Sequence, residues 1–187
     1  LTIHKKQGVF MSNKKVFFLV SQALVAGLYV CLTLVVSPLS YGNFQFRFSE
    51  VLVILAFYNP TNIIGLTLGC FIANLFSPML IYDITLGVAA TLISLVFMSK
   101  TKKLIIACIY PIIFNGLLVG LELYLAYSLP FFISALEVAV GELGVMVVGY
   151  IVFKIMEKNK KLMYVITDDK KFTEQTTDFY KSISSFY

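Results

Sequence analysis

Five acidic side chains lie inside apolar stretches of the sequence, where charged groups are rare. They are Glu50, Asp83, Glu122, Glu137 and Glu142. A carboxylate in a hydrocarbon environment costs free energy, so each of them is a candidate for a functional role. Carboxylates accept N–H groups in pairs and attract cations. We therefore expect these residues to bind a ligand that carries N–H donors, positive charge or both.

Amide side chains and one arginine accompany the acids. Asn74 and Asn115 lie in apolar runs, and the segment YGNFQFRFSE, residues 41–50, supplies the others. Asn115 precedes Glu122 by seven residues, so the two share one face of a helix. The polar residues expected to complete the ligand site are Asn43, Gln45, Arg47, Asn74 and Asn115.

Some of these charged groups have a structural alternative. Arg47 and Glu50 are three residues apart, and one alternative is that they neutralise each other. For Glu142 the alternative is a hydrogen bond to a neighbouring helix. The hypothesis of a ligand site requires only that the five acids are not all structural.

The elements that position these side chains are predicted to be membrane helices. The chain is 59% hydrophobic and 13% charged, whereas about a quarter of the residues in soluble domains are charged. A bilayer core of ~30 Å requires about 20 apolar residues. Four apolar runs are long enough, the run at 60–77 is adequate, and the run at 50–59 is too short alone. The runs lie at about 16–37, 50–59, 60–77, 79–98, 104–127 and 131–155.

The positions of the lysines favour six membrane crossings over five. They cluster before the first run, between the fourth and fifth runs, and after the last run. Six crossings place all three clusters on one side, which is the cytoplasm by the positive-inside rule. Five crossings would divide the clusters between the two sides. The sequence thus predicts a multi-pass protein of the cell membrane with both termini in the cytoplasm.

The segment before the short run has an unusual pattern. Polar and aromatic residues alternate along residues 41–49. A helix of about ten residues covers only half of the hydrocarbon core, so this segment is predicted to re-enter the membrane, with Phe48 and the other phenylalanines packed on helices. The alternative is an external loop whose aromatic residues lie at the membrane interface. The predicted fold is an all-α integral membrane protein: a six-span helical bundle with a re-entrant first external loop.

The chain divides into three predicted regions. Residues 1–15 form a cytoplasmic N-terminal tail, in which 1–10 precede a natural start at Met11. Residues 16–156 form the six-helix transmembrane substrate-binding domain, and residues 157–187 form a polar cytoplasmic tail. The C-terminal tail is expected to be largely disordered, with a surface helix as the alternative.

Small residues at helical spacing predict close helix contacts. Two such pairs lie in the middle of the chain, at Gly65 and Gly69 and at Gly116 and Gly120, and a third lies in the first run at Ala23-xxx-Gly27. Contact with a partner protein and internal packing are the two alternatives for each pair.

Several classes of function lack their motifs. The sequence has no G-x-x-x-x-G-K-[ST] phosphate loop, and its single histidine, His4, lies outside the apolar runs. We therefore expect no catalytic centre, no metal site and no cofactor, and nothing indicates a nucleic-acid partner. An alternative from a different class is a stand-alone channel or proton-coupled carrier that uses Glu122, Glu137 and Glu142 as a relay. Such a relay would need acidic residues through the full depth of the membrane, whereas the predicted inner half has almost none.

Five segments together give the chain a family resemblance over about residues 20–155. The segments are YGNFQFRFSEVLVIL, GLTLGCFIANLF, YDITLGVAATL, FNGLLVGLEL and ALEVAVGEL. The chain resembles the QueT family of substrate-binding S components of energy-coupling factor (ECF) importers. The resemblance implies uptake of a queuosine precursor, a 7-deazaguanine such as 7-aminomethyl-7-deazaguanine. It also implies a transmembrane coupling protein and a pair of cytoplasmic ATPases as partners, with Ala23 and Gly27 at the contact with the coupling protein.

The chemistry of such a ligand suits the acids. A deazaguanine presents adjacent N–H donors to one carboxylate, and its aminomethyl group is a cation for a second. We expect Glu122 or Glu137 to bind the guanine edge, and Asp83 or the other glutamate to bind the amine. Arg47 and Glu50 are expected to hold the gating loop. An alternative ligand is another vitamin-like heterocycle, such as a pteridine or a thiamin-like ring.

Overall fold

The protein is all-helical in the part that the structure describes. The computed structural model describes residues 2–36 and 47–167 and contains no strand in these ranges. The elements are α1 (Thr2–Val35), the 3-10 helix η1 (Phe48–Ile54), α3 (Leu55–Tyr58), α4 (Asn62–Asn74), α5 (Leu80–Tyr82), the π-helix η2 (Asp83–Gly87), α6 (Val88–Lys100), α7 (Leu104–Ala107), α8 (Ile109–Tyr127), α9 (Phe131–Met156) and α10 (Lys160–Ile166).

Four helices are long and apolar enough to cross a membrane, as predicted. They are Lys15–Val35, Leu80–Lys100, Leu104–Tyr127 and Phe131–Met156. Two shorter apolar helices, Phe48–Tyr58 and Asn62–Asn74, lie between the first two. The second of these is shorter than the run predicted at 60–77, because the chain turns after Asn74. Thirteen residues span only ~20 Å, so the six-crossing count stays a prediction.

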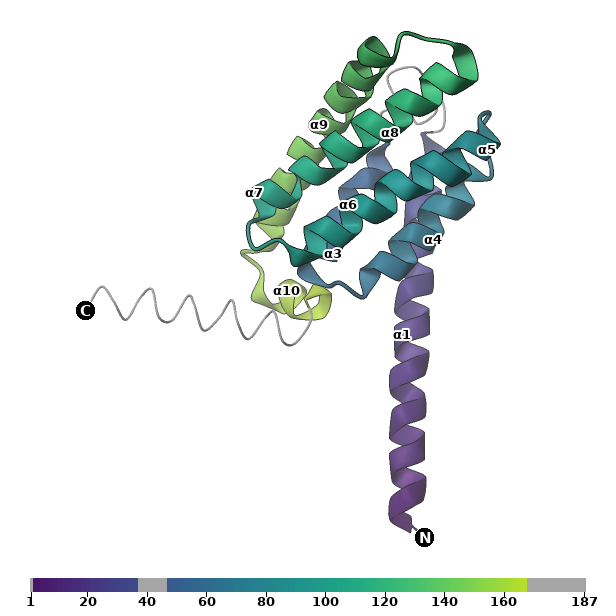
Figure 1. Cartoon of the computed structure of the whole chain (residues 1–187). Coiled ribbons are helices and arrows are strands. Elements are labelled where there is room, and N and C mark those ends of the chain that lie inside the picture. The colour runs from purple at the N-terminus through teal and green to yellow at the C-terminus, as the bar shows by residue number, and fades with distance from the viewer. Residues whose placement is uncertain (1, 37–46, 168–187) are drawn as a thin grey trace, which may run out of the picture.

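Small residues bring the helices into close contact at two places. The α1–α4 contact is tight because a Cβ atom added at Gly69 would lie 2.8 Å from the Cβ of Tyr29. The α8–α9 contact is tight because a Cβ atom added at Gly120 would lie 2.6 Å from the Cα of Ala135. Figure 1 shows α8 and α9 side by side. Internal packing is therefore the role of Gly65, Gly69, Gly116 and Gly120.

The small pair on α1 differs from these. Ala23 is exposed, and a Cβ atom added at Gly27 would meet nothing within 4 Å. Leu24 and Leu28 on the same helix are 63% and 55% exposed. This side of α1 is apolar, and no described residue covers it. Such a surface is typical of a helix that contacts lipid or a partner helix.

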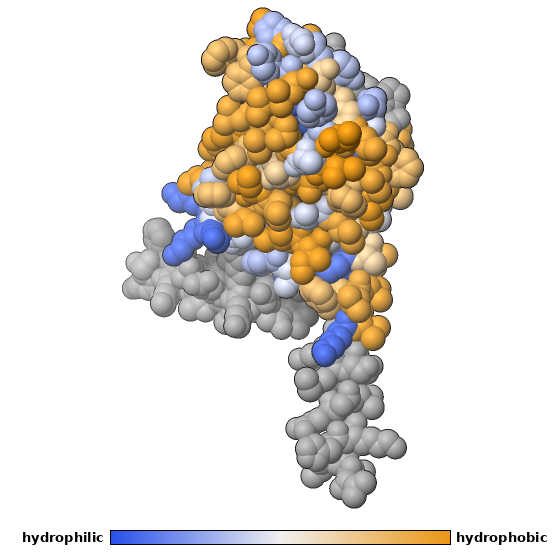
Figure 2. All heavy atoms as spheres, turned by 45° about the vertical axis from the view of Figure 1, so that its right-hand side comes forward, coloured by the Kyte–Doolittle hydropathy of each residue, from blue (hydrophilic) through white to orange (hydrophobic). Residues whose placement is uncertain are grey.

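Apolar side chains also cover much of the bundle. Figure 2 shows a largely hydrophobic face, with hydrophilic residues gathered toward its two ends. Ile81, Phe132 and Ile155 are among the most exposed large hydrophobic residues, at 73%, 84% and 61%. This surface is typical of a protein that lies in a bilayer.

The segment predicted to re-enter the membrane is described only from Arg47 onward. Asn43, Gln45 and the other residues up to position 46 lie outside the described ranges. Arg47 is buried, and Ser49 and Glu50 follow it in the buried part of η1. Phe48 is 38% exposed, although the alternation predicts a packed side chain there. It is exposed because η1 is a tight helix rather than an extended strand, so alternate residues no longer share a face.

The cytoplasmic end predicted for the chain contains a further helix. The hydroxyl of Tyr58 at the end of α3 donates a hydrogen bond of 2.8 Å to Glu157 Oε1, directly after α9. Residues 160–166 then form α10, with Met163 buried in the main hydrophobic core. The predicted tail at 157–187 therefore begins with a packed segment, and residues 168–187 lie outside the described ranges.

Candidate ligand site

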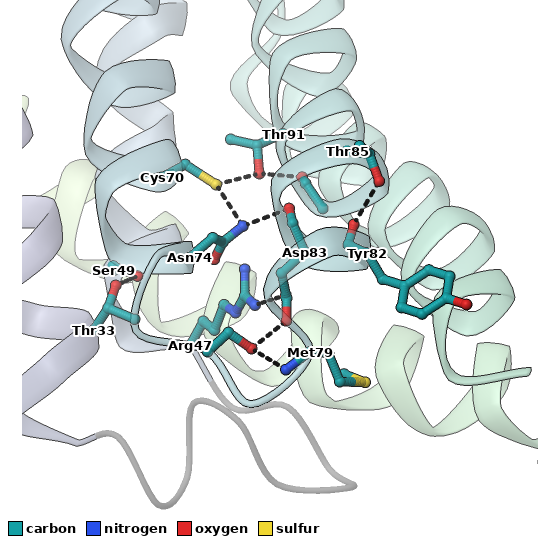
Figure 3. Close-up of polar contacts among 12 residues, drawn as sticks. Thr33, Arg47, Ser49, Cys70, Asn74, Met79, Tyr82, Asp83, Thr85 and Thr91 are labelled. Carbon is teal, nitrogen blue, oxygen red and sulfur yellow. Dashed lines mark hydrogen bonds and ion pairs between the residues drawn. The ribbon is translucent and has the colours of Figure 1, made fainter. Parts of the chain in front are cut away.

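A π-helical turn positions the first acidic residue of the site. Asp83 opens η2, a five-residue π-helix inserted between α5 and α6. Such insertions are frequent at functional sites because they widen one helical turn and redirect its side chains. Asp83 is fully buried, and Figure 3 shows it facing Arg47.

Both carboxylate oxygens of Asp83 have protein partners. Arg47 Nη2 lies 2.6 Å from Asp83 Oδ1 in a buried ion pair. The hydroxyl of Ser77, in the turn after α4, donates a hydrogen bond to Asp83 Oδ2. Asp83 thus ties the start of η1 and the α4–α5 turn to η2.

Asn74, the last residue of α4, is held by its amide nitrogen. Asn74 Nδ2 donates a hydrogen bond of 2.8 Å to the backbone carbonyl of Asp83 and lies 3.7 Å from Cys70 Sγ. The Asn74 Oδ1 atom is buried and has no hydrogen-bond partner in the structure. The amide is therefore fixed in an orientation that leaves its acceptor atom unpaired.

Gly87 allows polar groups from three elements to meet. A Cβ atom added there would lie 3.2 Å from Asn74 Nδ2, 3.4 Å from Asp83 Oδ1 and 3.7 Å from Glu122 Oε2. The side chain of any other residue would push into this space. Glycine at this position of η2 is what lets α4, η2 and α8 converge.

Glu122 is the acceptor without a partner at this point of convergence. It lies on α8, its side chain is fully buried, and neither Oε1 nor Oε2 has a hydrogen-bond partner in the structure. Burying a carboxylate without a partner costs several kcal/mol in general. Glu122 and Asn74 Oδ1 are buried acceptors that a ligand with N–H donors would satisfy.

A second group of acids lies among η1, α8 and α9. The hydroxyl of Tyr29 donates a hydrogen bond to Glu50 Oε1, whereas Glu50 Oε2 is buried without a partner. Glu142 on α9 is also buried, and its Oε1 atom has no partner. Asn115 lies close enough to interact with both carboxyl groups.

The charges in this interior do not balance. Four buried acids, Glu50, Asp83, Glu122 and Glu142, face a single buried basic side chain in the described ranges, Arg47. Arg47 forms its ion pair with Asp83, so no described basic side chain is left to pair with the other three carboxyl groups. Such an interior favours a ligand with positive charge or N–H donors.

All of the predicted site residues in the described ranges are buried except one. Glu137 is half-buried on α9 and has no hydrogen bond or ion pair within the described part of the chain. The ion pair of Arg47 is with Asp83, whereas the structural alternative considered from the sequence paired Arg47 with Glu50. The difference arises because η2 carries Asp83 to Arg47, while Tyr29 holds Glu50.

Sequence reasoning missed Tyr29, Ser77 and Gly87. Tyr29 is an aromatic residue inside an apolar run, where most such residues pack without a polar role. Ser77 precedes a proline in a turn, and Gly87 is one glycine among eleven. The signal that could have indicated Ser77 and Gly87 is their position within ten residues of Asp83.

The chemistry available here is binding. No group of three or more His, Cys, Asp or Glu side chains that could hold a metal ion occurs in the residues described. The unpaired acceptors are oxygen atoms of carboxylates and an amide, which bind N–H donors and cations.

Comparisons with known proteins match nearly all of this helical region. A family model described as QueT transporter matches residues 19–158. The queuosine precursor transporter QueT of Lactococcus lactis subsp. cremoris (strain MG1363) is 32% identical to the chain over 171 residues, which cover 81% of this chain and 99% of that protein. No solved structure matches the chain.

Proposed function

Since the chain belongs to the QueT transporter family, we propose that it captures a queuosine precursor outside the cell for uptake across the membrane. The proposed substrate is a 7-deazaguanine. This class of ligand has adjacent ring and exocyclic N–H donors, which match a carboxylate that lacks partners. The protein binds and carries its substrate without chemical change.

Glu122 is the observation that carries this proposal. Its two carboxylate oxygens are fully buried and unpaired, and its Oε2 atom approaches the same point beside Gly87 as the amide group of Asn74, whose Oδ1 atom is also unpaired. A planar edge with two parallel N–H groups satisfies both oxygens of one carboxylate. Glu122 is therefore the residue proposed to bind the guanine-like edge, with Asn74 beside it.

Asp83 has a different role in this proposal. Because Arg47 and Ser77 already occupy its two oxygens, Asp83 holds the site together and does not bind the amine. Asn43 and Gln45 remain proposed contacts of the ligand from the segment before η1, and Glu137 is no longer among the proposed contacts.

The proposed arrangement in the membrane has six crossings. The short helices Phe48–Tyr58 and Asn62–Asn74 form the second and third, and the segment before η1 re-enters the membrane from outside. With six crossings, Lys100 at the end of α6, Lys103 before α7 and Lys158 after α9 all lie on the cytoplasmic side. This placement agrees with the positive-inside rule. Both termini are cytoplasmic.

The proposed transporter is of the ECF type. In this proposal a transmembrane coupling protein contacts the uncovered side of α1 at Ala23 and Gly27, and a pair of cytoplasmic ATPases supplies energy. Leucine at Gly27 should then reduce uptake without changing ligand affinity. Uptake should fall to background in cells that lack the coupling protein and the ATPases, and full uptake in such cells would favour a stand-alone carrier.

Direct binding tests the proposed substrate. The full chain is purified in detergent and titrated by calorimetry with 7-aminomethyl-7-deazaguanine, its 7-cyano analogue, guanine, riboflavin and thiamin. Tight binding of a deazaguanine with much weaker binding of the vitamins is the expected result. Binding of thiamin or riboflavin alone would assign the site to another heterocycle, and a folded protein that binds none of them would overturn the proposal.

A further inference from the structure

We propose that Glu142, Glu50 and Asn115 form a second subsite that binds a cationic amino group of the same ligand. This inference rests on the proposed function, in which Glu122 binds the N–H edge. It makes the ligand site two-ended, with a neutral donor edge at Glu122 and an ammonium group at Glu142.

The two ends lie at different levels of the α8–α9 pair. Asn115 and Glu122 share one face of α8 and are seven residues apart, which is ~10 Å along the helix axis. Gly116 of α8 lies against Ala139 of α9, at 3.1 Å from an added Cβ atom.

The direction of α9 places Glu142 at the end that contains Asn115. Gly120 lies against Ala135 and Gly116 against Ala139, so later residues of α9 meet earlier residues of α8. Glu142, three residues beyond Ala139, is therefore level with the first half of α8 and not with Glu122. The interaction of its carboxyl group with Asn115 agrees with this placement.

A second buried carboxyl group accompanies Glu142 at this end. Glu50 and Glu142 are 1% and 3% exposed and lie on η1 and α9, which pack against each other. Electrostatic interactions link Glu142 to Glu50 and to Asn115. Each has one buried oxygen without a partner, Oε2 of Glu50 and Oε1 of Glu142. Like charges in a buried site repel strongly unless a cation or a proton lies between them.

An ammonium group fits this set of acceptors. It carries a positive charge and three N–H donors, and the subsite offers two unpaired carboxylate oxygens and the amide of Asn115. A metal ion fits less well because no cluster of three or more metal-binding side chains exists among the described residues.

The polar groups around Glu122 differ from those around Glu142, so the two ends of the site suit different parts of the ligand. Near Glu122 the neighbouring acid, Asp83, is already neutralised by Arg47, and the second unpaired acceptor is the neutral Oδ1 atom of Asn74. One carboxylate and one amide oxygen suit a flat edge with N–H groups. Two carboxyl groups suit a cation, so the amine belongs at Glu142.

The test compares two ligands that differ only at position 7. The full chain in detergent is titrated with 7-aminomethyl-7-deazaguanine and with its 7-cyano analogue, which has no amine, and the quantity measured is the ratio of the two Kd values. Glu142→Gln should weaken binding of the aminomethyl ligand by about 10-fold or more, the usual effect of removing a charged hydrogen-bond partner. Binding of the cyano ligand should change by less than about twofold, so the ratio shifts toward the cyano ligand.

Two further variants make the test independent of folding. Glu122→Gln should weaken binding of both ligands and leave the ratio unchanged, and Asn115→Ala should shift the ratio in the same direction as Glu142→Gln. Binding of the cyano ligand reports that each variant is folded. If Glu142→Gln does not fold, the ratio measured with Asn115→Ala decides.

The outcomes separate this inference from the proposed function. An unchanged ratio in both Glu142→Gln and Asn115→Ala, with a wild type that binds both ligands, overturns the second subsite alone. A wild type that binds neither deazaguanine overturns the proposed function and the subsite together.

Discussion

Asp83 and Glu122 are both fully buried acids in neighbouring helices, yet their surroundings are opposite. Both oxygens of Asp83 have partners, Arg47 and Ser77, whereas neither oxygen of Glu122 has one. The two side chains approach the same point beside Gly87. Burial alone therefore does not distinguish these two acids, whereas the pairing of their oxygens does.

Removing the charge of Asp83 should disturb this interior more than any other single change, and the effect should be on folding. Asp83→Asn leaves the buried Arg47 without its ion-pair partner, which typically costs about 3–5 kcal/mol. Thermal unfolding of the purified chain in detergent measures the loss. A variant as stable as the wild type would show that the ion pair does not hold η2 in place.

Gly87→Ala tests whether the two acids must meet at one point. The added methyl group would lie 3.2 Å from Asn74 Nδ2 and 3.7 Å from Glu122 Oε2. Such overpacking costs about 1–3 kcal/mol of folding stability. Because the methyl group would also occupy space beside Glu122, we expect ligand affinity to fall by about tenfold, or ~1.4 kcal/mol. Calorimetry measures it, and unchanged affinity would place the ligand away from Gly87.

Glu122→Gln should affect folding in the direction opposite to Asp83→Asn. The change removes a buried charge that has no partner, so the free energy of unfolding without ligand should rise by about 1 kcal/mol or stay the same. The same thermal unfolding experiment gives the comparison. A loss of stability similar to that of Asp83→Asn would indicate a structural role for Glu122.

Glu137→Gln is the matched control, for which we expect little change. Glu137 carries the same functional group as Glu122 but is half-buried, and it has no polar contact in the described ranges. We expect ligand affinity within about twofold of the wild type and a stability change within ~0.5 kcal/mol. A tenfold loss of affinity would return Glu137 to the site.

The amino-acid sequence predicted the all-helical class of fold and the family. The four long apolar helices, the glycine contacts at Gly69 and Gly120 and the family all agree with it. These features are predictable because hydrophobic length and small-residue spacing are local properties of the chain.

The sequence did not distinguish the satisfied acid from the unsatisfied ones. The sequence predicts Asp83 as a possible partner of the amine, whereas its ion-pair partner in the structure, Arg47, lies 36 residues away in the chain. The π-helical turn that brings them together adds a residue to one turn of a helix and leaves no signature in apolar periodicity. The sequence pattern does not distinguish Glu137 from Glu122, because packing sets the rotation of a helix about its axis.

The most direct test of the role of Glu122 is a calorimetric titration with 7-aminomethyl-7-deazaguanine. It compares Glu122→Gln with the wild type and with Glu137→Gln. We expect the affinity of Glu122→Gln to fall by about 10-fold to 100-fold, which corresponds to about 1.5–3 kcal/mol for hydrogen bonds to a charged group. Glu137→Gln should bind like the wild type. Equal affinity in all three proteins would contradict the assignment of the unpaired carboxylate as the group that binds the ligand.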